Sequence, residues 1–147
     1  MPRIIGIVGS EDAKFTPYGE TRARELITAL LLPVGTILTS GHCHLGGIDI
    51  YAEEIAELLG REKIIFPPKN LAWSTGYKPR NIKIARACTE LHNITVDQLP
   101  DLFAGMRFKL CYHCGTDTHV KSGGCWTAKQ VRLLGKPATI HVVKNYA

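Results

Sequence analysis

The sequence has no long uninterrupted hydrophobic segment. Its longest apolar run, residues 26–38, contains Pro33 and Gly35 and is too short to span a bilayer. The first residues also lack a signal-peptide pattern, because the apolar run that starts at Ile4 has the character of a strand and no small-residue cleavage site follows it. We therefore expect a cytoplasmic protein that has no membrane partner.

Neither internal repeats nor low-complexity linkers interrupt the 147 residues, and a chain of this length fits one domain. The net charge of +5 suits an anionic partner, either a nucleotide or a nucleic-acid backbone, but also an ordinary solvated basic surface. Lysine and arginine are scattered rather than clustered, so charge alone does not choose among these alternatives.

Short apolar runs alternate with segments of helical periodicity. Strands are expected at 3–8, 36–39, 63–66, 90–95 and 138–143, and helices at 18–32, 48–59, 79–87 and 127–134. Within the irregular stretch 98–123, one short strand is expected near 108–111. The alternation predicts an α/β, three-layer Rossmann-like domain over residues 1–147, with a mostly parallel five- or six-stranded sheet and helices on both faces. A Cys/His-rich insertion is expected at about 98–125.

Three glycine-containing loops, at 9–10, 40–49 and 122–127, adjoin predicted strands and helix starts. Ligands of open parallel sheets bind outside the carboxyl ends of the strands, where glycine lets backbone N–H groups approach an anion. Glycine in any single such loop is better explained by a tight turn, but three loops at one edge favour a nucleotide or phosphate site. The residues expected at this site are Gly9, Ser10, Ser40, Gly41, Gly46, Gly47, Asp49, Arg80, Asn81, Ser122, Gly123, Gly124 and Thr127.

Several other side chains are candidates near these loops. Arg80 stands at a helix start, where a cation is unfavourable unless an anion lies nearby, although a solvated first-turn arginine is the alternative. His42 and His44 are more suited to contacting a phosphate or the backbone than to holding a metal. Trp73 and Tyr77, on a loop expected to be mobile, either stack on a base or pack against their own loop.

Four motifs in order resemble the DprA/LOG-like (SLOG) Rossmannoid superfamily. The opening strand and Gly9-Ser10 resemble its first loop, and residues 39–52 resemble its "SGG…G.D..A" segment. Phe66-Pro67 followed by Arg80-Asn81 is similar to its "P…RN" segment, and residues 122–137 to its "GG.GT…GKP" segment. The resemblance implies a nucleotide-related ligand.

Members of this group include phosphoribohydrolases that were once grouped as lysine decarboxylase-like, DNA-processing proteins and nucleotide sensors. The phosphoribohydrolases carry a glutamate three residues after the motif threonine, where this chain has Gln130. Without that carboxylate, the resemblance does not support N-glycosidic hydrolysis by their mechanism. Asp49 is left as a candidate catalytic or ribose-contacting residue, and whether the chain is an enzyme stays open.

Cysteine and histidine cluster between residues 111 and 125. The spacing C-x2-C-x4-H-x5-C predicts a structural zinc site at Cys111, Cys114, His119 and Cys125, with His113 as an alternative ligand. Free thiols and a redox pair of Cys111 and Cys114 are the alternatives. Cys88 has an apolar setting and is expected in the core.

The leading hypothesis is therefore a nucleotide-binding domain, acting as a sensor or as an enzyme on glycosidic or phosphate bonds. The alternative is a single-stranded nucleic-acid-binding protein with a zinc-knuckle-like module, and a purely structural or assembly module is the third. The sequence leaves homo-oligomer formation open.

Overall fold

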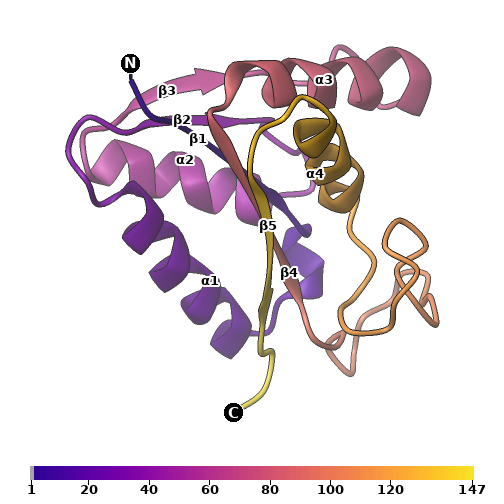
Figure 1. Cartoon of the computed structure of the whole chain (residues 1–147). Coiled ribbons are helices and arrows are strands. Elements are labelled where there is room, and N and C mark those ends of the chain that lie inside the picture. Colours follow the sequence, from indigo (N-terminus) through magenta and orange to yellow (C-terminus); the bar gives the residue numbers. More distant parts are fainter. Residues whose placement is uncertain (1) are drawn as a thin grey trace.

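The computed structural model describes residues 2–147, which form a five-stranded sheet between two pairs of helices (Figure 1). The strands are β1 (Ile4–Gly9), β2 (Ile37–Ser40), β3 (Glu62–Ile65), β4 (Glu90–Val96) and β5 (Ala138–Val143). The helices are α1 (Pro17–Leu31), α2 (Ile48–Leu58), α3 (Lys78–Ala87) and α4 (Gly124–Leu133). All neighbouring strands are parallel, in the order β3-β2-β1-β4-β5, so the predicted α/β Rossmann-like architecture is confirmed.

The order of the strands places the helices on opposite faces. From β1 the chain moves outward through β2 to β3, and α1 and α2 cover one face; it then returns to pair β4 with β1, and α3 and α4 cover the other (Figure 1). Side chains of β1 alternate accordingly: Ile5 and Ile7 pack in the core under α1 and α2, and Val8 packs under α3 and α4. The boundary between the two directions lies between β1 and β4, where ligands of such sheets bind.

The structure corrects the sequence-based boundaries in three places. The last helix begins at Gly124, three residues before the expected position, because its first turn includes the glycine loop. Residues 73–77, expected as a mobile loop, form a π-helical turn, η2 (Trp73–Tyr77), that leads directly into α3. No strand forms near 108–111 in the described chain; Cys111 makes only an isolated bridge to Thr116.

Two short elements complete the fold. A 3₁₀ turn, η1 (Asp12–Lys14), links β1 to α1, and the side chain of Thr16 caps α1 by accepting a hydrogen bond from the Gly19 amide. Between residues 2 and 147, no helix has the length and apolar character needed to cross a membrane.

Asn145 ties the end of the chain to the start of α1. Its side chain is fully buried; the carboxamide oxygen accepts from the Thr16 amide at 3.0 Å, and the nitrogen donates to the carbonyls of Lys14 (2.8 Å) and Gln98 (2.6 Å). The Thr16 hydroxyl in turn donates to the Asn145 carbonyl. One amide side chain therefore satisfies three backbone groups from two loops.

We predict that Asn145→Ala lowers the free energy of unfolding by about 2–4 kcal/mol, since it leaves buried backbone groups unpaired. Urea titration followed by circular dichroism measures this loss. Lys144→Ala, which changes an exposed neighbour, serves as the control and should stay within about 0.5 kcal/mol of the parent. A loss below about 1 kcal/mol for Asn145→Ala would show that the junction is not held by this side chain.

Candidate functional site: a cavity at the carboxyl ends of β1 and β4

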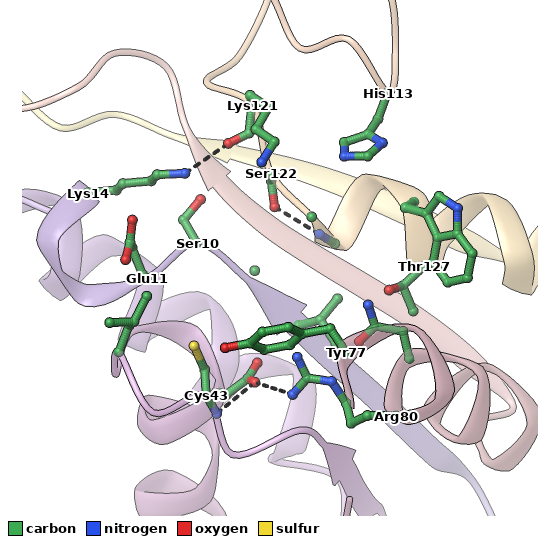
Figure 2. Close-up of a pocket in the computed structure, with 18 of the residues that line it drawn as sticks. Ser10, Glu11, Lys14, Cys43, Tyr77, Arg80, His113, Lys121, Ser122 and Thr127 are labelled. Carbon is green, nitrogen blue, oxygen red and sulfur yellow. Dashed lines mark hydrogen bonds and ion pairs between the residues drawn. The ribbon is translucent and has the colours of Figure 1, made fainter. Parts of the chain in front are cut away.

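A cavity of about 660 Å³ opens beyond the carboxyl ends of β1 and β4 (Figure 2). Its lining comes from the loop after β1, the loop before α2, η2 and α3, the irregular segment 97–123, and the first turn of α4. Segments far apart in the sequence thus meet at one site, as expected for a doubly wound sheet. The size is in the range of small-molecule sites in proteins.

Nine of the thirteen sequence-predicted site residues line this cavity. They are Gly9, Ser10, Asp49, Arg80, Asn81, Ser122, Gly123, Gly124 and Thr127. Ser40, Gly41, Gly46 and Gly47 do not line it. The three predicted loops therefore converge, although the middle loop contributes through Cys43, Leu45 and Asp49 rather than through its glycines.

The four residues outside the lining shape the loop that carries Asp49. The Ser40 hydroxyl donates to the Ile7 carbonyl at 2.7 Å, and the Gly41 carbonyl accepts from Arg80 at 2.6 Å. Gly47 adopts φ 84°, and a Cβ there would lie 2.2 Å from the Ser10 carbonyl oxygen. Gly46 likewise has a positive φ of 74°. Each of the four residues therefore has a structural reason that needs no ligand.

Backbone amides at the site are partly used by the protein itself. The Ser10 amide donates to Ile94, and the Gly124 amide to the Ser122 hydroxyl. The conformation of Gly123 differs from that of Gly47. Its backbone has ordinary helical angles, and a Cβ built on it would meet nothing within 4 Å. Neither φ nor the surrounding protein requires glycine at this lining position, and the missing side chain leaves the backbone open to the cavity.

Three basic side chains face the cavity. Lys14 donates to the Lys121 carbonyl at 3.1 Å, and Figure 2 shows both lysines beside Ser10 at one side of the site. Burial lowers the pKa of Lys14. Arg80 lies on the floor, with its guanidinium 5.2 Å from the centre of the Tyr77 ring.

Arg80 and Asp49 form a buried pair. The Nη1 atom of Arg80 lies 3.6 Å from a carboxylate oxygen of Asp49, and both side chains are about nine-tenths buried or more. Asp49 also accepts from the Cys43 amide at 3.1 Å, whereas Nε of Arg80 has no hydrogen-bond partner within residues 2–147. Burial raises the pKa of Asp49 to about 6, although Arg80 and the Cys43 amide act in the opposite direction.

Aromatic rings form much of the remaining wall. Trp73 from η2 and Trp126 from α4 meet edge to face, with ring centroids 5.0 Å apart. Both line the cavity, as do Tyr77, Tyr112 and His113. Trp126, in the first turn of α4, is thus part of the cavity wall.

Sequence reasoning missed Lys14, Lys121 and Tyr112 as cavity residues. None belongs to a glycine loop, and each reaches the site because of the path its segment takes. Lys121 stands directly before Ser122, so adjacency to a motif was the only available signal. His42 and His44 lie outside the lining: the first contacts Glu53 (2.7 Å) and the second the Tyr77 hydroxyl (2.9 Å).

The four predicted metal ligands come together next to the cavity. One ligand atom each from Cys111, Cys114, His119 and Cys125 lies within 4.8 Å of the other three, so this cluster could hold a metal ion. His113, the alternative ligand, lines the cavity instead. The remaining cysteines lie elsewhere: Cys88 is buried in the core under α3 and α4, as expected, and Cys43 faces the cavity.

The surroundings of the cluster suit thiolate and imidazole ligands. Nδ1 of His119 contacts the Thr118 hydroxyl at 3.1 Å, which leaves Nε2 facing Cys125 at 3.5 Å. The Asn93 side chain donates to the Cys125 sulfur at 3.3 Å. Burial raises the pKa of Cys111, but hydrogen bonds from the backbone of Ser122, Cys114 and His113 and from the His119 side chain together bring that pKa to about 6. Burial raises the pKa of the other two thiols, Cys114 and Cys125.

Comparison with known proteins finds similarity in structure only. No protein-family model and no curated protein matches the chain. The molybdenum cofactor carrier protein from Chlamydomonas reinhardtii superposes with a TM-score of 0.62 at 19% identity, over 95% of this chain and 76% of that one. A second structure of the Moco carrier protein from the same organism gives 0.58 at 20% identity, over 96% and 76%.

DNA processing protein A (DprA) from Streptococcus pneumoniae gives a TM-score of 0.55 at 13% identity, over 95% of this chain and 50% of its own length. The chain thus spans half of DprA. At these identities the similarity establishes the fold, which is the one that the DprA/LOG-like resemblance implies. That fold is compatible with ligand binding in general.

The buried carboxyl of Asp49 predicts a pH dependence of stability. Its pKa is about 6 in the folded protein against an ordinary value of 3.8, so the folded state binds an extra proton between these values. The resulting stabilisation is present at low pH and is lost as pH rises through about 6. Between pH 4.5 and 7.5 this amounts to about 2 kcal/mol.

Asp49→Asn removes this contribution while preserving the size of the side chain. The difference in unfolding free energy, parent minus variant, should therefore fall by about 2 kcal/mol from pH 4.5 to 7.5 in urea titrations. A difference that is constant with pH would mean that Asp49 titrates in its ordinary range.

Proposed function

We propose that this protein binds a phosphate-bearing nucleotide, or a cofactor of nucleotide-like chemistry, in the cavity at the ends of β1 and β4. The observation that carries the proposal is the combination, in one cavity of about 660 Å³, of three basic side chains with a paired-tryptophan wall. A phosphate needs cationic and N–H donors, and a flat heterocycle gains from contact with aromatic faces. Few small-molecule classes other than nucleotides and related cofactors use both.

The phosphate belongs beside Lys14, Lys121 and Gly123. The two ammonium groups supply charge, and the bare backbone at Gly123 allows an oxygen to approach the start of α4, where the helix dipole is positive. Thr127 adds a hydroxyl group from α4, whereas the Ser10 hydroxyl donates to Thr95 Oγ1 at 3.0 Å. This assignment leaves the tryptophan pair for the ring of the ligand.

Binding, in a sensor or carrier role, is favoured over glycosidic hydrolysis. Gln130 does not line the cavity; it lies in a separate shallow hollow with Ile82 and Arg86. Of the carboxylates that face the ligand, Glu11 and Asp49, the second is engaged with Arg80. If the protein does carry out acid–base chemistry, Asp49 is the residue we assign to it, because a carboxyl with a raised pKa can exchange a proton near neutral pH.

We further propose that the Cys111, Cys114, His119 and Cys125 cluster holds a structural zinc ion. Three sulfurs and one imidazole nitrogen form the tetrahedral donor set that structural zinc prefers, with no position left for a substrate. In the metal-free alternative these atoms would be three free thiols packed around an imidazole.

Elemental analysis of the purified protein should find about one zinc per chain, and chelation should lower the melting temperature. A content below about 0.2 per chain, together with no effect of chelation, would contradict the zinc assignment. Calibration with a protein of known zinc content provides the control.

A thermal-shift screen of nucleotides tests the binding proposal. A nucleotide at about 100 times its dissociation constant should add about 2.7 kcal/mol of stability, and the corresponding nucleoside much less. No shift with any nucleotide at millimolar concentration would contradict the proposal. Titration with a single-stranded oligonucleotide at several salt concentrations tests the nucleic-acid alternative, which requires tight binding that weakens steeply with salt.

Lys14→Met keeps the half-buried aliphatic stem but removes the charge. We expect it to weaken binding of the nucleotide about 10- to 100-fold, the value of a hydrogen bond to a charged group, and to leave binding of the nucleoside unchanged. Lys83→Met, on the exposed side of α3, is the matched control. Equal affinities of the two variants would exclude Lys14 from the phosphate site.

A further inference from the structure

The predicted metal ligands and the cavity-lining residues alternate along the sequence. Tyr112 and His113 lie between Cys111 and Cys114, and residues 121–124 lie between His119 and Cys125. Residues 112–113 and residues 121–124, which both line the cavity, therefore each lie between two predicted metal ligands in the sequence. A single ion at the cluster would fix both ends of each lining segment.

The same segment has little else to hold it in place. Between residues 97 and 121 the only buried side chains are those of Cys111 and His119, and both are ligands. Leu102 and Met106 are 96% and 74% exposed, so no apolar core forms there. A stretch that buries so little apolar surface does not offset the entropy of ordering its backbone unless another interaction contributes.

The hydrogen bonds that dock this segment lie near its two ends. At the start, the Gln98 carbonyl accepts from the Asn145 side chain at 2.6 Å, and the Asp101 amide donates to the Tyr146 hydroxyl at 3.0 Å. The Val120 amide donates to the Val96 carbonyl at 2.9 Å, and the Val120 carbonyl accepts from the Thr95 hydroxyl at 2.9 Å. Between these ends, the Cys111–Thr116 bridge only joins two residues of the same turn. The cluster is thus the main connection between the turn at 111–116 and the first turn of α4.

Tyr112 links the metal turn to the charge in the cavity. The Lys121 ammonium lies 5.2 Å from the centre of the Tyr112 ring and 5.4 Å from that of Phe108. The Lys121 carbonyl also receives the Lys14 side chain at 3.1 Å. Displacement of the turn would therefore move one cationic group of the phosphate site and remove the anchor of the other.

We propose that metal loading at Cys111, Cys114, His119 and Cys125 builds one wall of the cavity, so that the metal and the nucleotide bind with positive cooperativity. This inference rests on the proposed function. Loss of the metal releases residues 102–119, which lie between the docked ends of the segment, disperses the two lysines and opens the aromatic wall at Tyr112. By reciprocity, bound nucleotide raises the affinity for the metal by the same factor.

The test compares metal-replete full-length protein with the same protein after chelation and after zinc is restored. Titration calorimetry with ADP, with adenosine as the phosphate-free control, should show affinity falling about 10- to 100-fold on zinc removal and recovering on zinc addition. Trypsin supplies an independent readout, since Arg107 and Lys109 are exposed within the segment; their cleavage should accelerate when the metal is removed.

Two substitutions of Cys114 distinguish the effect of the bound metal from the effect of the thiol group itself. Cys114→Ser should weaken zinc binding and reproduce the chelated state, whereas Cys114→His, which keeps a zinc ligand, should restore ADP affinity. Cys88→Ala removes a buried cysteine outside the cluster and is the matched control. If Cys114→Ser fails to fold, the reversible chelation experiment decides alone.

The outcomes of these experiments test the metal-built cavity wall and the proposed nucleotide binding separately. Equal ADP affinity with and without metal, or an unchanged cleavage rate at Arg107 and Lys109, overturns the metal-built wall. Failure of the metal-replete protein to bind ADP or any other nucleotide overturns the proposed function instead. In that case the cleavage rate still shows whether the ion orders the segment.

Discussion

The pairing of β1 with β4 is the constraint on which the site depends. Five consecutive residue pairs, from Ile5–Glu90 to Gly9–Ile94, hold these strands in parallel register. Because the connections leave β1 toward one face and β4 toward the other, their loops part at the carboxyl end and leave space that no helix fills. Gly9 permits this close register, since a Cβ there would lie 2.1 Å from the Ile94 carbonyl oxygen.

Charge inside the cavity is balanced rather than uniformly positive. Arg80 forms an ion pair with Asp49 and donates a hydrogen bond to the Gly41 carbonyl, and these contacts stabilise the loop before α2. The guanidinium is therefore less available to a ligand. Lys14 and Lys121 carry no comparable ion pair within the site. Any attraction of an anion to the cavity therefore comes mainly from the lysines, even though the arginine is the residue that the DprA/LOG-like resemblance singles out.

Sequence periodicity and motif order were sufficient for the fold and for most of the site. Parallel strands separated by helices admit few topologies, and each strand's carboxyl end must lie at the same edge, so Gly9, Asp49 and Gly123 could be placed together in advance. The role of each glycine within its loop could not be predicted from the sequence. Gly41 and Gly47 serve protein contacts whereas Gly123 faces open space, and all three look alike in sequence.

Residues on irregular segments were beyond prediction for a different reason. Lys14 and Tyr112 reach the cavity along paths set by tertiary contacts, without periodicity to reveal which way a side chain points. The cysteine spacing was nonetheless informative, because ligands of one ion must converge whatever path the chain takes. In this chain, Tyr112, His113 and residues 121–124 lie in the sequence between members of the converging Cys/His cluster, and these residues line the cavity.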